Sequence, residues 1–170
     1  MHEAEFGIDG AIVASASAQQ HTLPHKIGVM NHGKIEQWDT AYNLYHRPDT
    51  RFVADFIGQG VLLRGRTGNN GTIDTELGLM HTTNLPMGAL EKNAYADVLV
   101  RPDDILHDDE SHSQAEVVHK AFRGAEILYT LKLPSGAKVL SLVPSHHNHE
   151  IGQKIGIKLE IDHVVAFPVA

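Results

Sequence analysis

Histidine is the residue whose number and spacing most suggest chemistry. The chain of 170 residues contains 13 histidines and no cysteine. Three of the histidines, His146, His147 and His149, fall within four positions, and imidazole nitrogens are good ligands for Zn²⁺, Ni²⁺ and Cu²⁺. The three do not form a closed ligand set at a recognised spacing. The sequence therefore favours a solvated polar loop here and leaves a weak metal site as the alternative.

A second polar segment, residues 107–112, mixes imidazole with carboxylates in the order HDDESH. It has the same two interpretations, a solvated loop or a weak cation site. Asp103 and Asp104 precede it and indicate solvated charge. The chain contains no nucleophile elbow and no HExxH motif, so the sequence predicts no catalytic site. The pair Arg64 and Arg66 could touch an anion or nucleic acid, but charge on a strand edge is the simpler explanation.

A phosphate-loop spacing, G-x-x-x-x-G-K, occurs at Gly28–Lys34. The residue after the lysine is Ile35, where a serine or threonine would be needed to hold Mg²⁺. A phosphate loop also opens a helix, so that the first amides of the helix face the phosphates. Here a β-like segment follows, and the spacing predicts a hairpin turn rather than a nucleotide site.

Composition narrows the remaining classes of function. The formal charge is −7 and only 6 % of the residues are aromatic, which disfavours an oligonucleotide groove built from basic residues and stacking platforms. The absence of cysteine excludes a disulfide framework and thiolate metal sites and fits the cytoplasm. We find neither a signal-peptide pattern nor an apolar run long enough to span a bilayer.

The expected secondary structure changes near residue 60, from a hairpin with two short helices to a series of strands. Residues 27–30 and 34–38 predict a hairpin around the Asn31-His32-Gly33 turn. Two short helices should follow, capped by Thr40 and by Asp49 or Thr50 and stopped at Pro48 and Gly58. The second helix places four apolar side chains on one face, and so short a helix needs another surface to pack against. These four are Phe52, Val53, Phe56 and Ile57.

From Val61 onward the apolar period is two, which is typical of strands. Seven or eight short strands separated by turns predict a mainly β fold, a small barrel or a sandwich. The clearest hairpin joins residues 127–133 to 137–143 through Pro134-Ser135-Gly136. Residues 1–26 are weakly patterned and are predicted to be a frayed arm or a gene-start remnant. The expected strands are 62–66, 72–77, 96–100, 114–121, 127–133, 137–143, 155–161 and 163–167.

The stretch from Ile27 to Gly58 resembles the C-terminal end of the ATP-binding subunit of ABC importers. The family pattern runs roughly I-x-V-M-x-x-G-x-I-x-Q-x-G-T-P-x-x-L-Y-x-x-P-x-x-x-F-V-A-x-F-I-G. The chain departs from it at Asp39, often glycine, and at Ala41, usually proline. Matching positions are Ile27, Val29, Met30, Gly33, Ile35, Gln37, Thr40, Leu44, Tyr45, Pro48, Phe52, Val53, Ala54, Phe56, Ile57 and Gly58.

A second resemblance follows in the β-patterned part. Residues 100–105 (VRPDDI), residues 122–124 (FRG) and the hairpin after them are similar to the TOBE regulatory domain of such subunits. This implies an OB-like β-barrel. The implied organisation is an unassigned arm at 1–26, the remnant of an ATPase domain at 27–60, and a TOBE domain at 61–170. The likeness is greatest to ferric-iron importers, with polyamine, sulfate and sugar importers as close relatives.

The resemblance implies a regulatory and dimer-contact role without catalysis. Residues 1–26 match none of the family's phosphate loop, signature, Walker B acid or switch histidine, so the chain is expected to be a fragment that does not hydrolyse ATP. ATP and Mg²⁺ are then cofactors of the complete subunit only, and no cofactor is expected here. The implied partners are a second copy, through the helix face named above, and membrane permease subunits, with no nucleic acid. The implied location is the cytoplasmic side of the inner membrane. A His-rich metal module and an OB-fold binder of oligonucleotides or small anions remain the alternatives.

Overall fold

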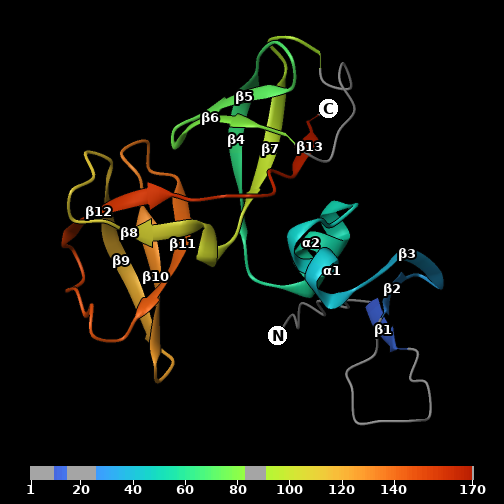
Figure 1. The fold of residues 1–170 in the computed structure, drawn as a ribbon, viewed down its shortest axis with the longest axis horizontal. Coiled ribbons are helices and arrows are strands. Elements are labelled where there is room, and N and C mark those ends of the chain that lie inside the picture. The colour runs from blue at the N-terminus through green and yellow to red at the C-terminus, as the bar shows by residue number, and fades with distance from the viewer. Residues whose placement is uncertain (1–9, 15–25, 83–90, 170) are drawn as a thin grey trace, which may run out of the picture. The chain divides into compact units, whose positions relative to one another are not determined.

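A computed structural model describes residues 10–14, 26–82 and 91–169. The chain divides into two units, Met1–Gly58 and Gln59–Ala170, and each is described by itself. The described residues are mainly β, as the sequence predicts, and they form three sheets (Figure 1). None of the helices among them has the length and hydrophobicity needed to cross a bilayer.

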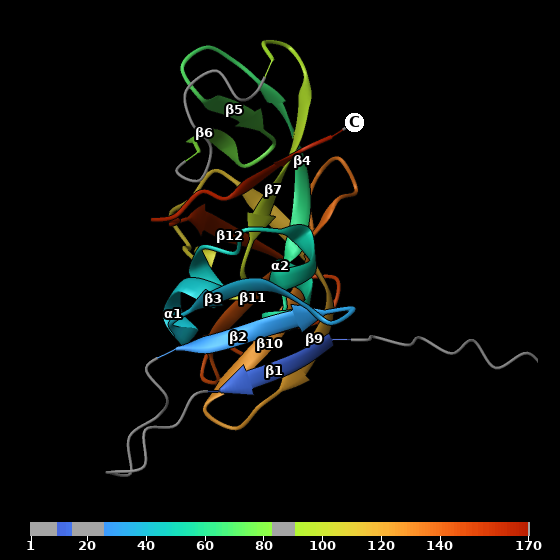
Figure 2. The ribbon, with the colours of Figure 1, turned by 90° about the vertical axis from the view of Figure 1, so that its right-hand side faces the viewer.

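The first unit is a small antiparallel sheet followed by two short helices. Figure 2 shows its three strands side by side in the order β1-β2-β3. The expected hairpin, helices and caps are confirmed: Thr40 and Thr50 each accept a hydrogen bond, from the amides of Asn43 and Val53. The elements are β1 (Gly10–Ala14), β2 (Ile27–Asn31), β3 (Lys34–Asp39), α1 (Ala41–His46) and α2 (Arg51–Ile57).

Two details of this unit differ from expectation. Strand β1 pairs with β2 along Gly10–Ala14, so this part of the predicted frayed arm is an edge strand; the rest of the arm lies largely outside the described residues. The β2–β3 turn consists of His32 and Gly33, both with positive φ. Two positive φ values suit the right-handed twist of a hairpin, which explains why the phosphate-loop spacing here is a turn.

The second unit contains two five-stranded sheets. In chain order its strands are β4 (Val61–Thr67), β5 (Thr72–Thr75), β6 (Gly78–His81), β7 (Tyr95–Val100), β8 (Ile105–His107), β9 (Gln114–Phe122), β10 (Glu126–Lys132), β11 (Lys138–Pro144), β12 (Lys154–Leu159) and β13 (Ala166–Pro168), with the short helix η1 (Pro102–Asp104) before β8. One sheet has the order β13-β7-β4-β5-β6 and the other β11-β10-β9-β12-β8. Strands β6 and β8 were not predicted, because three or four residues carry too little alternation to be recognised.

The second of these sheets curls into a nearly closed barrel. Its outermost strands, β11 and β8, are joined by the hydroxyl of Ser141, which donates to the carbonyl of Ile105 at 2.6 Å in a buried position. The register of β9 against β10 shifts between Thr130 and Leu131 and leaves Val118 unpaired. Such a bulge bends a strand and increases its twist. It also changes which residues face inward, which explains the weak contrast of this strand in the sequence.

The barrel core is apolar and is shared by both sheets of the unit. Tyr129 lies at its centre and is completely buried. Leu63 and Val100, from the other sheet, belong to the same cluster. The buried core residues of the barrel's own strands are Ile105, Ala115, Val117, Ile127, Tyr129, Leu131, Val139, Val143, Ile155 and Ile157, joined by Leu133 just after β10. Burial of this much apolar surface stabilises the barrel and joins it to the other sheet of the unit.

Candidate functional site

Three histidines from two distant segments meet beside the barrel. His107 ends β8, whereas His147 and His149 belong to the connection between β11 and β12. One ring nitrogen from each of the three lies within 4.8 Å of the other two. The ring centroid of His107 is 5.0 Å from that of His147 and 4.6 Å from that of His149. We call these three residues the histidine cluster.

The backbone around the cluster is fixed by two buried or partly buried side chains. The phenolic hydroxyl of Tyr129 donates to the carbonyl of His147 at 2.7 Å and accepts from the amide of His149 at 2.8 Å. The ammonium group of Lys120 donates to the carbonyl of His149 at 3.0 Å and to Oδ1 of Asn148 at 2.9 Å. The connection that carries two of the histidines is therefore anchored to β10 and β9.

The ring nitrogens of the cluster have few protein partners. Nε2 of His107 and Nε2 of His149 are buried and have no hydrogen-bond partner among the described residues. The side chain of His107 is only 7 % exposed. Its Nε2 lies 3.0 Å from Oδ1 of Asp109, but the two atoms are not aligned as a hydrogen bond. Two buried nitrogen atoms are thus left without the partners that such atoms normally have.

Burial also affects the charge of the cluster. Desolvation first, and then the neighbouring His107 and His147, lower the pKa of His149; Asp109 and a side-chain hydrogen bond with Gln153 act in the opposite direction. The neutral imidazole is therefore favoured at this position. A neutral ring nitrogen is the form that binds a metal ion.

Of the histidines that the sequence singles out, the structure places His147 and His149 in the cluster. The ring of His146 lies 4.3 Å from that of His147, centroid to centroid, but the group of mutually close ligand atoms does not include it. His107 takes the third place. In the sequence His107 belongs to a separate polar segment, and the pairing of β8 with β12 brings it to the other two. The metal role of these residues stays a prediction.

The helix face predicted for dimer or core contacts packs within the first unit. Val53 is completely buried with Val29 and Leu44, and Phe52, Phe56 and Ile57 are partly buried against the same cluster. The rings of Phe52 and Phe56 stack at 5.5 Å between centroids. The hairpin and α1 thus supply the second surface that the helix needs. Its role in dimer contact remains a prediction.

The sequence predicts strand-edge charge for the arginine pair, and this is wrong for Arg66 only. Strand β5 pairs with β4 at Arg66 and Thr67, so Arg66 lies between two strands, whereas Arg64 is paired on one side, with β7. Nε of Arg64 lies 2.5 Å from Oδ1 of Asp97 on β7, and this hydrogen bond raises the pKa of the guanidinium further. The guanidinium carbon of Arg66 lies 5.6 Å from the ring centroid of Tyr95. A cross-strand ion pair and a cation–π contact account for both arginines.

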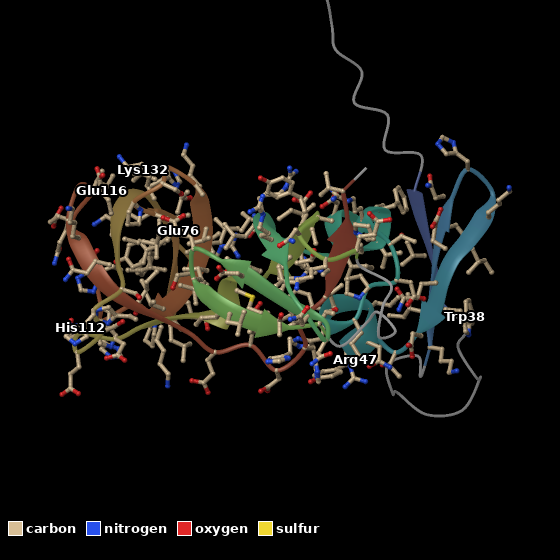
Figure 3. All side chains as sticks on the ribbon, turned by 90° about the horizontal axis from the view of Figure 1, so that it is seen from above. Trp38, Arg47, Glu76, His112, Glu116 and Lys132 are labelled. Atoms are coloured by element: carbon tan, nitrogen blue, oxygen red, sulfur yellow. The ribbon has the colours of Figure 1, made fainter. Side chains whose placement is uncertain are left out.

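A groove on the barrel is lined by charged residues of both signs. Figure 3 shows Glu116 of β9 and Lys132 of β10 next to each other, and Nζ of Lys132 lies 2.7 Å from Oε2 of Glu116. The remaining lining residues are His112, Gln114, Ala115, Leu133, Pro134 and Lys154. The ion pair satisfies two of these charges, and the buried side-chain atoms without a partner in the described part of the chain belong to His107 and His149 rather than to this groove.

Comparison with known proteins gives the context of the barrel. Residues 98–167 match the family model described as the TOBE domain. This range begins in β7 and ends in β13, and it includes all five strands of the barrel sheet.

Curated relatives match over most of the chain. The spermidine/putrescine import ATP-binding protein PotA 2 of Pseudomonas aeruginosa is 30 % identical over 152 residues, which is 83 % of this chain and 42 % of the relative. The spermidine/putrescine import ATP-binding protein PotA of Chromobacterium violaceum is 28 % identical, and the match covers 84 % of this chain and 42 % of PotA. The putrescine transport ATP-binding protein PotG of Escherichia coli is 26 % identical, and the match covers 96 % of this chain and 47 % of PotG. The chain thus spans less than half the length of these relatives.

These findings correct one expectation and support another. The ferric-iron assignment is not supported, because the relatives are named for spermidine and putrescine. The chain contains a TOBE domain and is related to the ATP-binding subunits of ABC importers.

Proposed function

We propose that this chain is the regulatory and dimer-contact part of the ATP-binding subunit of an ABC importer. The observation that carries the proposal is the two-part match: a TOBE domain at residues 98–167 and a similarity to ATP-binding proteins that extends over 83 % of the chain. The part of the chain before the TOBE domain agrees with the subunit pattern in its hairpin and its two capped helices.

The proposed role is not catalytic. The phosphate-loop spacing at Gly28–Lys34 falls on β2, the turn and the start of β3, so no helix begins there whose amides could face phosphates. Equilibrium titration with Mg²⁺ and ATP tests this part of the proposal. No saturable binding at physiological ATP concentration is expected. Binding in that range would contradict the non-catalytic role.

The solute class that we propose is a polyamine. The support is the named activity of the relatives, which import spermidine or putrescine. Deletion of the gene that encodes this chain, followed by uptake of labelled spermidine and of labelled ferric iron, distinguishes the two solutes. Reduced spermidine uptake with unchanged iron uptake is the expected result. The opposite pattern would contradict the polyamine assignment.

The proposed partners are a second copy of the chain and membrane permease subunits, which would hold the protein at the cytoplasmic side of the inner membrane. Support for self-association comes from the first unit. Ile35, Trp38 and Tyr42 are 58, 39 and 57 % exposed, and Figure 3 labels Trp38 on β3. Large apolar side chains left in water favour a contact that covers them.

A further inference from the structure

We propose that His107, His147 and His149 form a binding site for one divalent transition-metal ion of the zinc type and are its three protein ligands. This inference concerns a site in the barrel unit and does not depend on the transport role proposed above. It rests on the geometry of the cluster, on the buried nitrogen atoms without partners and on the anchoring of the surrounding backbone.

The geometry is close to that of a tetrahedral site. Zinc binds imidazole nitrogen at about 2.0–2.1 Å, which places two ligand atoms of a tetrahedron about 3.3 Å apart. The three ring nitrogens lie within 4.8 Å of one another, so rotation of the imidazole rings is enough to close the set. Oδ1 of Asp109 is 3.0 Å from Nε2 of His107, but the group of mutually close ligand atoms does not include it, so the fourth position of the tetrahedron is left open.

The donor atoms are available for an ion. Nε2 of His107 and Nε2 of His149 are buried and lack hydrogen-bond partners among the residues described. The side chain of His107 is more than nine-tenths buried. A buried polar atom without a partner costs free energy, and a bound cation would remove that cost at both nitrogens at once.

The choice of metal follows from the ligand types. Imidazole suits zinc, copper, iron and nickel, whereas calcium and magnesium prefer sites built from oxygen atoms alone. Three neutral imidazoles carry no net charge, so a bound divalent ion keeps both positive charges, and the Asp109 carboxylate, 3.0 Å from Nε2 of His107, lies near enough to offset part of them.

Two independent anchors would hold the ligands in place before an ion arrives. Tyr129 fixes the backbone of His147 and of His149, and the pairing of His107 with Ile157 holds β8 against β12. A bound ion would therefore join the β11–β12 connection to β8 with little reordering of the backbone. Preorganisation of this kind favours affinity because less conformational entropy is lost on binding.

The experiment is a Zn²⁺ titration of the untagged chain by calorimetry, since a histidine tag would itself bind the metal. One equivalent is expected to bind, and the ring ¹⁵N signals of the cluster should shift in long-range NMR spectra. His147→Ala and His149→Gln should each lower the affinity about tenfold or more, because even outer contacts of a metal site change affinity by that factor. His107→Gln should lower the affinity as well. Because the side chain of His107 is buried, a circular dichroism spectrum first checks that this variant folds.

The matched control is His146→Ala, which removes an exposed histidine next to the cluster and should leave the affinity unchanged. Three results would overturn the proposal: no binding with one-to-one stoichiometry, wild-type affinity in both His147→Ala and His149→Gln, or an equal loss in His146→Ala. If His107→Gln does not fold, the other two variants still decide the outcome.

Discussion

The buried phenol of Tyr129 accepts a hydrogen bond from the backbone amide of His149 at 2.8 Å. The same hydroxyl donates to the carbonyl of His147 at 2.7 Å. A buried residue of the barrel core thus helps to fix the conformation of the connection between β11 and β12. This contact links the packing of the fold to the geometry of the histidine cluster.

Tyr129→Phe should reduce both stability and metal affinity. The substitution keeps the ring in the core but removes two hydrogen bonds and leaves the His149 amide and the His147 carbonyl with only their mutual hydrogen bond at 3.2 Å, which costs about 0.5–1.5 kcal/mol of the free energy of unfolding. Urea denaturation measures the stability and calorimetry measures the Zn²⁺ affinity. Tyr95→Phe, at a half-exposed tyrosine of β7, is the control and should change neither quantity. A Tyr129→Phe protein as stable as the wild type would show that the hydroxyl does not anchor the connection.

Asp104 should make stability depend on pH in the acidic range. Burial is the main cause that raises the pKa of its carboxyl from 3.8 to about 6, although the amide of Arg101 donates to it at 2.7 Å. Because the folded state binds the proton more tightly than the unfolded state, stability should fall as the pH rises from about 4 to about 6 and stay level above that range.

Asp104→Asn removes this titration and keeps an oxygen that can accept from the amide of Arg101. The carboxyl is partly exposed, so solvent reduces the effect of its raised pKa on stability. The free energy of unfolding of the variant, relative to that of the wild type, should be higher at pH 7 than at pH 4 by on the order of 1–2 kcal/mol. Thermal or urea unfolding at several pH values measures the difference. Asp55→Asn, at an exposed aspartate of α2, is the control. A constant difference between Asp104→Asn and the wild type from pH 4 to pH 7 would contradict the prediction.

Gly156→Ala should destabilise the barrel where β12 approaches β8. A Cβ atom at this position would lie 2.0 Å from the carbonyl oxygen of Asp108, a backbone atom that cannot move without disturbing the pairing beside His107. We expect a loss of about 2–3 kcal/mol, as for an overpacked core. Gly60→Ala is the control, since the atoms nearest its Cβ belong to the side chains of Leu99 and Arg101. Equal losses of unfolding free energy in the two variants would contradict this account.

The sequence predicts local structure well where the signal is itself local. The cap at Thr40, the second cap at Asp49 or Thr50 and the hairpin around Gly136 depend on residues within a few positions, and the sequence predicts them; it predicts the first hairpin turn too, but with Asn31 in it, where the structure has His32 and Gly33 at positive φ. The bulge at Val118 and the three-residue strand β8 were missed, because their conformations are set by partner strands rather than by their own pattern.

The histidine cluster shows the same limit. His147 and His149 were noticed because they are neighbours in the sequence. His107 is 40 positions earlier, and only the pairing of β8 with β12 and the anchoring by Tyr129 bring it to them. The signal that could have found it was the second imidazole and carboxylate segment, residues 107–112, taken together with the first.

The most direct test of the proposed regulatory and dimer-contact role is the mass of the purified chain in solution. The chain has a mass of 18.6 kDa, so a dimer would have a mass of about 37 kDa, twice that value. Light scattering coupled to size exclusion, over a range of concentrations and without added nucleotide, gives this mass. Our account predicts the dimer at the upper concentrations. A single species of 18.6 kDa throughout would contradict it.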